Sequence, residues 1–95
     1  MKTLHLVLKH KWFDMIKSGE KLEEYREVTD YWISRLTDAD GKLIQWDAIK
    51  FQRGYTNAEH LTVRCKKVSV KKGRAEWGAS PEHRYITFDL GARCT

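Results

Sequence analysis

One charged stretch in the first third of the chain limits the possible folds most strongly. Residues 21–28 alternate as a strand does, and one face then carries Leu22, Glu24, Arg26 and Val28. The two apolar residues make this the expected core side, so Glu24 and Arg26 would point inward. Buried charges are costly unless they are paired and hydrogen-bonded. The pattern therefore predicts either a purely structural Glu24–Arg26 pair at an open barrel end or a polar pocket lined by both residues.

Hydrophobic periodicity and turn residues divide the whole chain into short strands and short helices. The expected strands are residues 3–9, 21–28, 48–53, 60–70 and 84–90, and the expected helices are residues 12–16 and 31–37. The apolar phase slips within the fourth strand, which predicts a β-bulge near Lys66 and Lys67. The order β-α-β-α-β-β-β predicts an α+β fold. We expect a small, mixed, mostly antiparallel β-barrel with two short helices, formed as a single domain by residues 1–95.

The third expected strand carries a second inward arginine. Ile49 and Phe51 mark its core side, and Arg53 shares their face at the end of the strand. Residues 54–57 follow as a loop, and loops at strand ends are where binding groups collect. The second helix is expected to bury Trp32, Ile33 and Leu36.

The overall charge suits an anionic partner. The chain has 95 residues and a formal net charge of +5, which favours nucleic acid or serves solubility alone. Four tryptophans can fill a core or stack on bases. The two cysteines, Cys65 and Cys94, lack zinc-ligand spacing, and Cys65 is expected to be a buried thiol. We expect no metal or cofactor. With no signal peptide or membrane-spanning run visible, we expect a cytoplasmic monomer without membrane contact.

The N-terminal half of the chain resembles a known domain family. Its opening strand, residues 12–21 and the Glu24-Tyr25-Arg26 segment are similar to those of the ASCH domain, a member of the PUA-like superfamily. The recurring family pattern Gly-x-Lys-x-x-Glu-x-Arg is matched by Gly19, Lys21, Glu24 and Arg26. Residues 51–55 and 76–78 look like segments of small bacterial and phage-type members, so the resemblance covers essentially the whole chain.

This resemblance implies a PUA-like barrel with a basic cleft beside it, used on RNA or nucleotides. The family includes RNA-binding modules, an amidohydrolase that acts on N4-acetylcytidine, and ribonucleases. The amidohydrolase branch uses a Lys, a Thr and a Glu, and Lys21 matches the Lys. Glu24 stands at the Thr position, and a carboxylate cannot replace a hydroxyl nucleophile or donor. This departure argues against the amidohydrolase reaction but not against a pocket.

The candidate site combines cations, one carboxylate and aromatic residues. Lys21, Arg26 and Arg53 are expected to contact phosphate or base edges, because arginine suits bidentate phosphate recognition. Glu24 would accept a hydrogen bond from a base or orient Arg26. Lys21 can join this cleft only if the chain is irregular just after Gly19. Stacking faces are expected from Tyr55 and Trp77 at the rim, or from Trp12 or Tyr25.

Three functions remain open from the sequence. The first is an RNA- or nucleotide-binding module. The second is a nucleoside- or RNA-processing enzyme, with Lys21 as a general acid or base and Glu24 or Glu76 as the partner carboxylate. The third is a protein-interaction domain in which these charges are structural.

Overall fold

The elements of the chain follow one another in the predicted order. The computed structural model describes residues 1–56 and 59–94, so Asn57, at the end of the expected loop 54–57, lies outside the described residues. The elements are β1 (Thr3–Leu8), α1 (His10–Lys17), β2 (Glu23–Glu27), α2 (Asp30–Leu36), β3 (Ala48–Arg53), β4 (His60–Lys72), a short 3₁₀ helix η1 (Ala75–Trp77) and β5 (Arg84–Cys94). The fold class is α+β, as predicted.

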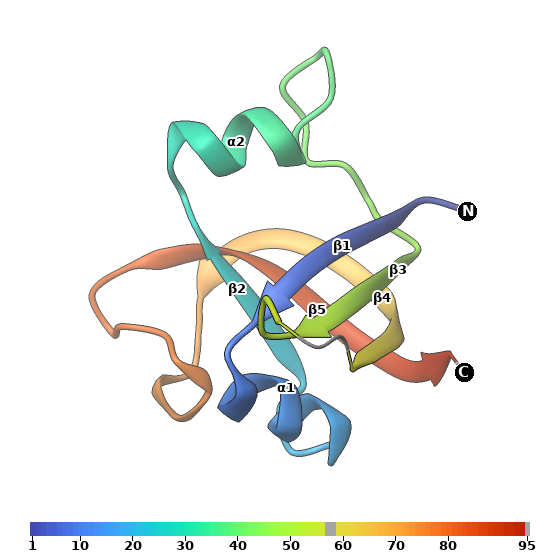
Figure 1. Cartoon of the computed structure of the whole chain (residues 1–95). Coiled ribbons are helices and arrows are strands. Elements are labelled where there is room, and N and C mark those ends of the chain that lie inside the picture. The colour runs from blue at the N-terminus through green and yellow to red at the C-terminus, as the bar shows by residue number, and fades with distance from the viewer. Residues whose placement is uncertain (57–58, 95) are drawn as a thin grey trace.

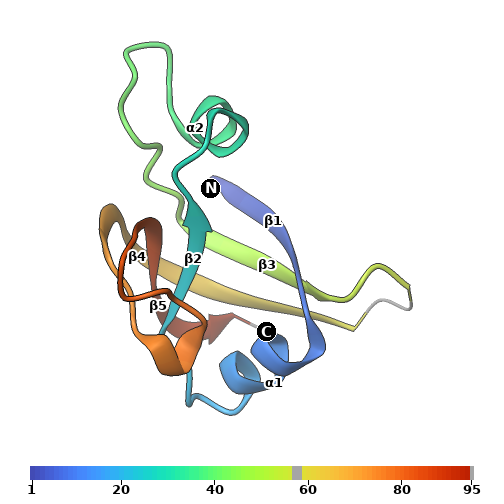
Figure 2. The same cartoon turned by 90° about the vertical axis from the view of Figure 1, so that its left-hand side faces the viewer.

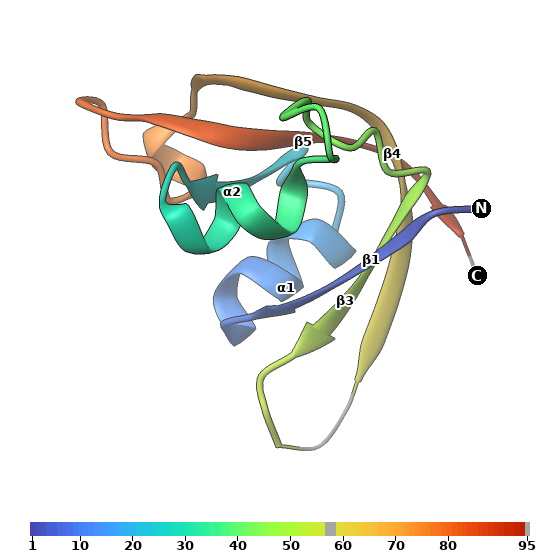
Figure 3. The same ribbon diagram turned by 90° about the horizontal axis from the view of Figure 1, so that it is seen from above.

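The five strands form one curled sheet with the order β1-β3-β4-β5-β2. β1 and β3 run parallel, whereas the other neighbouring pairs are antiparallel. Figures 1 and 3 show that the sheet curls into a half-barrel, with β1 and β2 as its two edges. Arg26 on β2 crosses between these edges and donates from Nη2 to the carbonyl oxygen of Val7 on β1, at 3.3 Å. The two helices lie at opposite ends of the half-barrel (Figures 1 and 2).

Alternating apolar side chains from four of the strands fill the inside of the half-barrel. Phe13, Phe51 and Phe88 are fully buried and bring α1, β3 and β5 together. The predicted inner residues of the last strand, Ile86, Phe88 and Leu90, are all buried. Burying a phenylalanine or leucine side chain contributes roughly 1.5–3 kcal/mol, so this cluster is the main source of stability.

The structure corrects the expected core at three positions. Leu22 and Val28 are 54% and 47% exposed, because β2 spans only Glu23–Glu27 and both leucine and valine lie beyond its ends. Ile33 is also exposed, since α2 covers one end of the half-barrel and only Leu36 is fully buried from it. The charged residues Glu24 and Arg26 therefore point inward without the two apolar neighbours that we expected beside them.

The predicted irregularity of the fourth strand is present. The register between β4 and β5 shifts between Val63 and Cys65 and again between Cys65 and Lys67, next to the expected bulge at Lys66 and Lys67. Such a shift lets a long strand bend, and β4 extends two residues beyond the predicted end at position 70. Cys65 is half-buried, not fully buried as expected, because it lies at this irregularity.

Within the described ranges, none of the helices has the length and apolar character needed to cross a membrane. The same residues contain no group of three or more histidine, cysteine, aspartate or glutamate side chains placed to hold a metal ion.

Candidate functional site

The site is built around the carboxylate of Glu24, which the alternation of β2 turns inward. Glu24 is only 6% exposed. Its Oε1 accepts a hydrogen bond from Nζ of Lys21, and its Oε2 accepts one from Nη2 of Arg26, both at 2.8 Å. One buried carboxylate thus holds two cations from its own neighbourhood of the chain, and these paired contacts offset the cost of burying the charges.

Lys21 joins this cluster because the chain is irregular after α1, as the sequence required. Gly19 has a left-handed conformation with φ of 86°, which few residues other than glycine adopt. The backbone N–H groups of Glu20 and Lys21 then both donate to the carbonyl oxygen of Met15, at 3.0 Å. This turn brings the side chain of Lys21 within hydrogen-bonding distance of Glu24.

The ammonium group of Lys21 is among the most buried charges of the described chain. The residue is 2% exposed, and burial lowers the pKa of Lys21 although the carboxylate of Glu24 opposes the shift. Its Nζ also donates to the carbonyl oxygen of Glu23 and lies 4.9 Å from the ring centroid of Tyr25. Lys21 therefore pairs with Glu24 inside the protein and does not reach open solvent.

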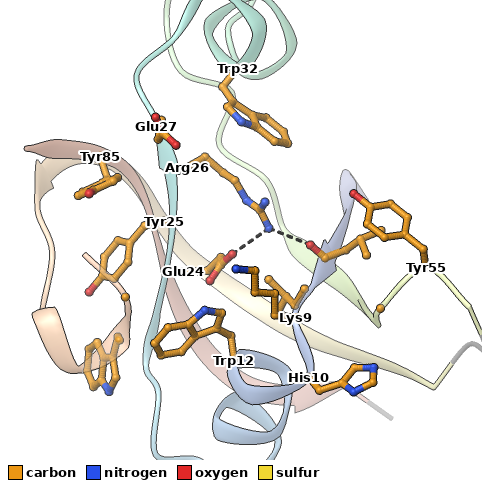
Figure 4. A pocket seen from close by; sticks show the side chains of 15 residues that line it. Lys9, His10, Trp12, Glu24, Tyr25, Arg26, Glu27, Trp32, Tyr55 and Tyr85 are labelled. Carbon is orange, nitrogen blue, oxygen red and sulfur yellow. Dashed lines mark hydrogen bonds and ion pairs between the residues drawn. The ribbon is translucent and has the colours of Figure 1, made fainter. Parts of the chain in front are cut away.

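Arg26 lies above Glu24 and retains an unused donor. Its Nη2 serves both Glu24 and the Val7 carbonyl, as Figure 4 shows, and its Cζ lies 5.1 Å from the ring centroid of Trp32. Its buried Nε has no hydrogen-bond partner among the residues that the structure describes. Buried polar groups are nearly always satisfied, so this donor is available to a ligand or a water molecule in an adjoining cavity.

A cavity of about 790 Å³ opens beside Arg26, and we call it the main cavity. It lies between the end of β1, the start of α1, β2, α2, the loop after β3 and η1 (Figure 4). Its aromatic lining comprises Trp12, Tyr25, Trp32, Tyr55, Trp77 and Tyr85. Its charged and histidine lining comprises Lys9, His10, Glu24, Arg26 and Glu27. A flat ligand in this cavity could contact several aromatic rings, the hydrogen-bond donors of Arg26 and the carboxylate acceptor of Glu24.

The structure brings most of the predicted site residues together. Glu24, Arg26, Tyr55 and Trp77 line the main cavity, and so do the alternative stacking residues Trp12 and Tyr25. Tyr55 is 88% exposed and stands at the rim, as expected of a residue in a loop. Lys21 contacts Glu24 but does not itself line the cavity.

Arg53 and Glu76 lie elsewhere. Arg53 donates from Nε and Nη2 to the two carboxylate oxygens of Asp14 on α1, at 2.9 and 3.0 Å, and it does not line the main cavity. This hydrogen bond from Arg53 also lowers the pKa of Asp14. Glu76 is largely exposed beside Arg74, at 3.8 Å, and is likewise outside the lining. The expectation that Arg53 points into the cleft is therefore wrong.

This correction changes the charge of the site. Among the described lining residues, the cations Lys9 and Arg26 meet the carboxylates Glu24 and Glu27, so the formal charges balance when His10 is neutral. The basic cleft that we expected is therefore not found in this lining, because Arg53 does not contribute to it. The main cavity suits a largely uncharged, hydrogen-bonding group better than a bare phosphate.

Several lining residues were missed from the sequence. Lys9 and His10 directly follow β1, and their place at a strand end could have marked them. Trp32 packs against the core, as predicted, but its second role, lining the cavity over Arg26, was missed. Gly78 has φ of 100°, and a Cβ there would lie 2.9 Å from Cζ2 of Trp12, so glycine lets the η1 loop approach α1.

Comparison with protein-family models, with curated proteins and with solved structures finds no match for this chain.

Proposed function

We propose that this protein binds RNA or a nucleotide in the main cavity, as a PUA-like domain of the ASCH type. One observation carries the proposal: six tryptophan and tyrosine residues line a cavity of about 790 Å³ together with the buried carboxylate of Glu24 and its partly buried partner Arg26. That volume falls in the range of about 300–1,000 Å³ that is usual for ligand sites. Recognition of single-stranded RNA relies on this combination of aromatic faces and hydrogen-bonding groups.

The Glu24–Arg26 pair gives the cavity both kinds of hydrogen-bonding character. Arg26 offers donors, including the unpaired Nε, and the carboxylate of Glu24 offers acceptor capacity beside it. The edges of nucleobases carry donors and acceptors in close proximity, and their faces stack on aromatic rings. The net charge of +5 attracts a polyanion as a whole, although the lining of the main cavity is balanced.

Fluorescence titration tests this proposal, because Trp12, Trp32 and Trp77 line the cavity. Nucleosides, mononucleotides and short RNAs are expected to change the tryptophan emission, and RNA affinity should fall as salt rises. Arg26→Ala should weaken binding by about 1.5–3 kcal/mol, the value of a hydrogen bond to a charged group. Arg53→Ala removes the same charge outside the cavity and is the matched control.

Two outcomes would contradict the proposal. The first is the absence of binding to every nucleoside, nucleotide and RNA at low ionic strength. The second is an Arg26→Ala variant that loses stability but keeps full affinity, which would return Glu24 and Arg26 to a structural role in an interaction domain.

The enzymatic alternatives have weaker support from the geometry. The lowered pKa of Lys21 suits proton transfer. However, Lys21 is 2% exposed and does not line the main cavity, so a substrate there could not reach its ammonium group. Glu76, the other candidate partner, is exposed to solvent away from the cavity. Incubation with N4-acetylcytidine and with RNA, followed by product analysis, tests turnover directly, and we expect none.

A further inference from the structure

A second, smaller cavity of about 300 Å³ lies beside η1, and we call it the side cavity. It is lined by Glu23, Lys66, Arg74, Trp77 and Asp89, together with two leucines. Trp77 also lines the main cavity, so the two cavities meet at this one tryptophan. An indole that forms a wall of both hollows offers a stacking surface to groups in either of them.

Within residues 1–56 and 59–94, the side cavity contains two cations that are not closely paired. Lys71 does not line the side cavity, but its Nζ lies 2.8 Å from Oε2 of Glu23 and 3.2 Å from Oδ1 of Asp89, so one lysine is shared by both lining carboxylates. Lys66 makes no ion pair within the part of the chain that the structure describes, and Arg74 has only the distant carboxylate of Glu76 at 3.8 Å. The side cavity is thus lined by two cations, Lys66 and Arg74, that no close carboxylate of the described residues holds, and by two carboxylates that Lys71 pairs with from outside the lining.

The wall between the cavities is held in place by its own contacts. The backbone N–H of Arg74 donates to the hydroxyl oxygen of Tyr25 at 3.0 Å, and that hydroxyl donates to Oε1 of Glu23 at 2.7 Å. The guanidinium carbon of Arg74 lies 5.0 Å from the ring centroid of Trp77. The backbone at Arg74 is therefore held by Tyr25, and the guanidinium of Arg74 lies beside the tryptophan that lines both cavities.

We propose that the ligand is single-stranded RNA of at least two nucleotides that occupies both cavities. One base lies in the main cavity, the next nucleoside lies in the side cavity beyond Trp77, and the phosphate that links them meets Arg74 and Lys66. The proposal rests on the proposed function and narrows it, because a nucleoside would fill only the main cavity. Lys66 and Arg74 suit the linking phosphate because neither is held by a close carboxylate in the described part of the chain, whereas Arg26 of the main cavity is paired with Glu24 at 2.8 Å.

Binding of defined small probes tests this arrangement. The probes are the four common nucleosides, their 5′-monophosphates and the four homodinucleoside monophosphates, titrated by calorimetry and tryptophan fluorescence. We expect each dinucleoside monophosphate that binds to have an affinity about tenfold or more above that of its nucleoside. This gain is what one hydrogen bond between a charged side chain and the phosphate contributes. The 5′-monophosphate is expected to gain less, because its phosphate is not held between two nucleosides.

A pair of double variants gives the decisive comparison. Lys66→Ala with Arg74→Ala should abolish the gain of the dinucleoside monophosphate and leave nucleoside affinity unchanged. Lys67→Ala with Lys72→Ala removes the same charge from exposed positions of β4 that line neither cavity, and it should keep the gain.

The outcomes separate the two proposals. If nucleosides bind and dinucleoside monophosphates bind no more tightly, the two-cavity inference is overturned while the proposed function stands. Equal losses from the two double variants would also overturn it, because they would show that only total charge matters. If no probe binds at low salt, the proposed function fails and the two-cavity inference fails with it.

Discussion

Removal of the Glu24 charge should destabilise the protein strongly. Glu24→Gln keeps the size of the side chain but leaves the ammonium of Lys21 buried, at 2% exposure, without a carboxylate; only the neutral amide oxygen, the carbonyl oxygen of Glu23 and aromatic faces remain around it. Removing one partner of a buried ion pair costs about 3–5 kcal/mol. A domain of this size has a free energy of unfolding of roughly 5–14 kcal/mol, so the variant should lose a large part of its stability.

Lys21→Met should cost less, although it breaks the same contact. It removes the buried cation itself, and the carboxylate of Glu24 keeps its hydrogen bond from Arg26 at 2.8 Å. The expected loss is about 1.5–3 kcal/mol, the value of one hydrogen bond to a charged group. The double variant removes the buried ammonium that Glu24→Gln leaves unpaired, while Arg26 loses its carboxylate in both variants, so the double variant should recover about 2 kcal/mol relative to Glu24→Gln alone.

Guanidinium unfolding of the four proteins, followed by tryptophan fluorescence, measures these free energies. Glu20→Gln is the control, since it removes a carboxylate from an exposed position near the cluster and should change stability by less than about 0.5 kcal/mol. Additive losses in the double variant would refute the reasoning, because they would show that Lys21 and Glu24 do not depend on each other.

Three further predictions concern single residues. Burial raises the pKa of the Cys65 thiol, so in a Cys94→Ser background iodoacetamide at pH 8 should modify the folded protein more slowly than the denatured one, and equal rates would contradict this. Gly78→Ala places a Cβ 2.9 Å from Trp12 at φ of 100°, and it should lower the free energy of unfolding by about 1–3 kcal/mol; an unchanged unfolding midpoint would count against the close approach. Burial raises the pKa of Tyr25, so its contribution to stability is complete below pH 10 and is lost as the pH rises through the folded-state value. Up to that pH the total tyrosinate absorbance at 295 nm should therefore be the same in the native protein and in Tyr25→Phe, because Tyr25 stays protonated, and a larger signal from the native protein would refute the shift.

The sequence predicted the parts of this fold that depend on local alternation. It placed Ile49, Phe51 and Phe88 inside and turned Glu24 and Arg26 inward, because a strand in a half-barrel has one covered face. It also identified the condition under which Lys21 joins Glu24, namely a break in the strand after Gly19.

Alternation could not show what covers each strand end. The alternation of β3 predicted that Arg53 points into the cleft. At this end of β3, however, α1 presents Asp14, and the carboxylate of Asp14 binds the guanidinium of Arg53. Trp32 and Tyr85 reach the main cavity because α2 and β5 are brought to β2 by the curl of the sheet. Such contacts between distant segments have no signature in residue spacing.

The strand order also determines the sequence of assembly during synthesis. β3, β4 and β5 are consecutive antiparallel neighbours, so they can pair as soon as they leave the ribosome. β1 and β2 emerge earlier than the strands that receive them, β3 and β5, and must wait unpaired. We expect the three-stranded meander to form first and the two flanking strands to dock last. The main cavity lies between those flanks and is completed only in this final step, and hydrogen exchange should show β1 and β2 amides opening at lower free energy than β4 amides.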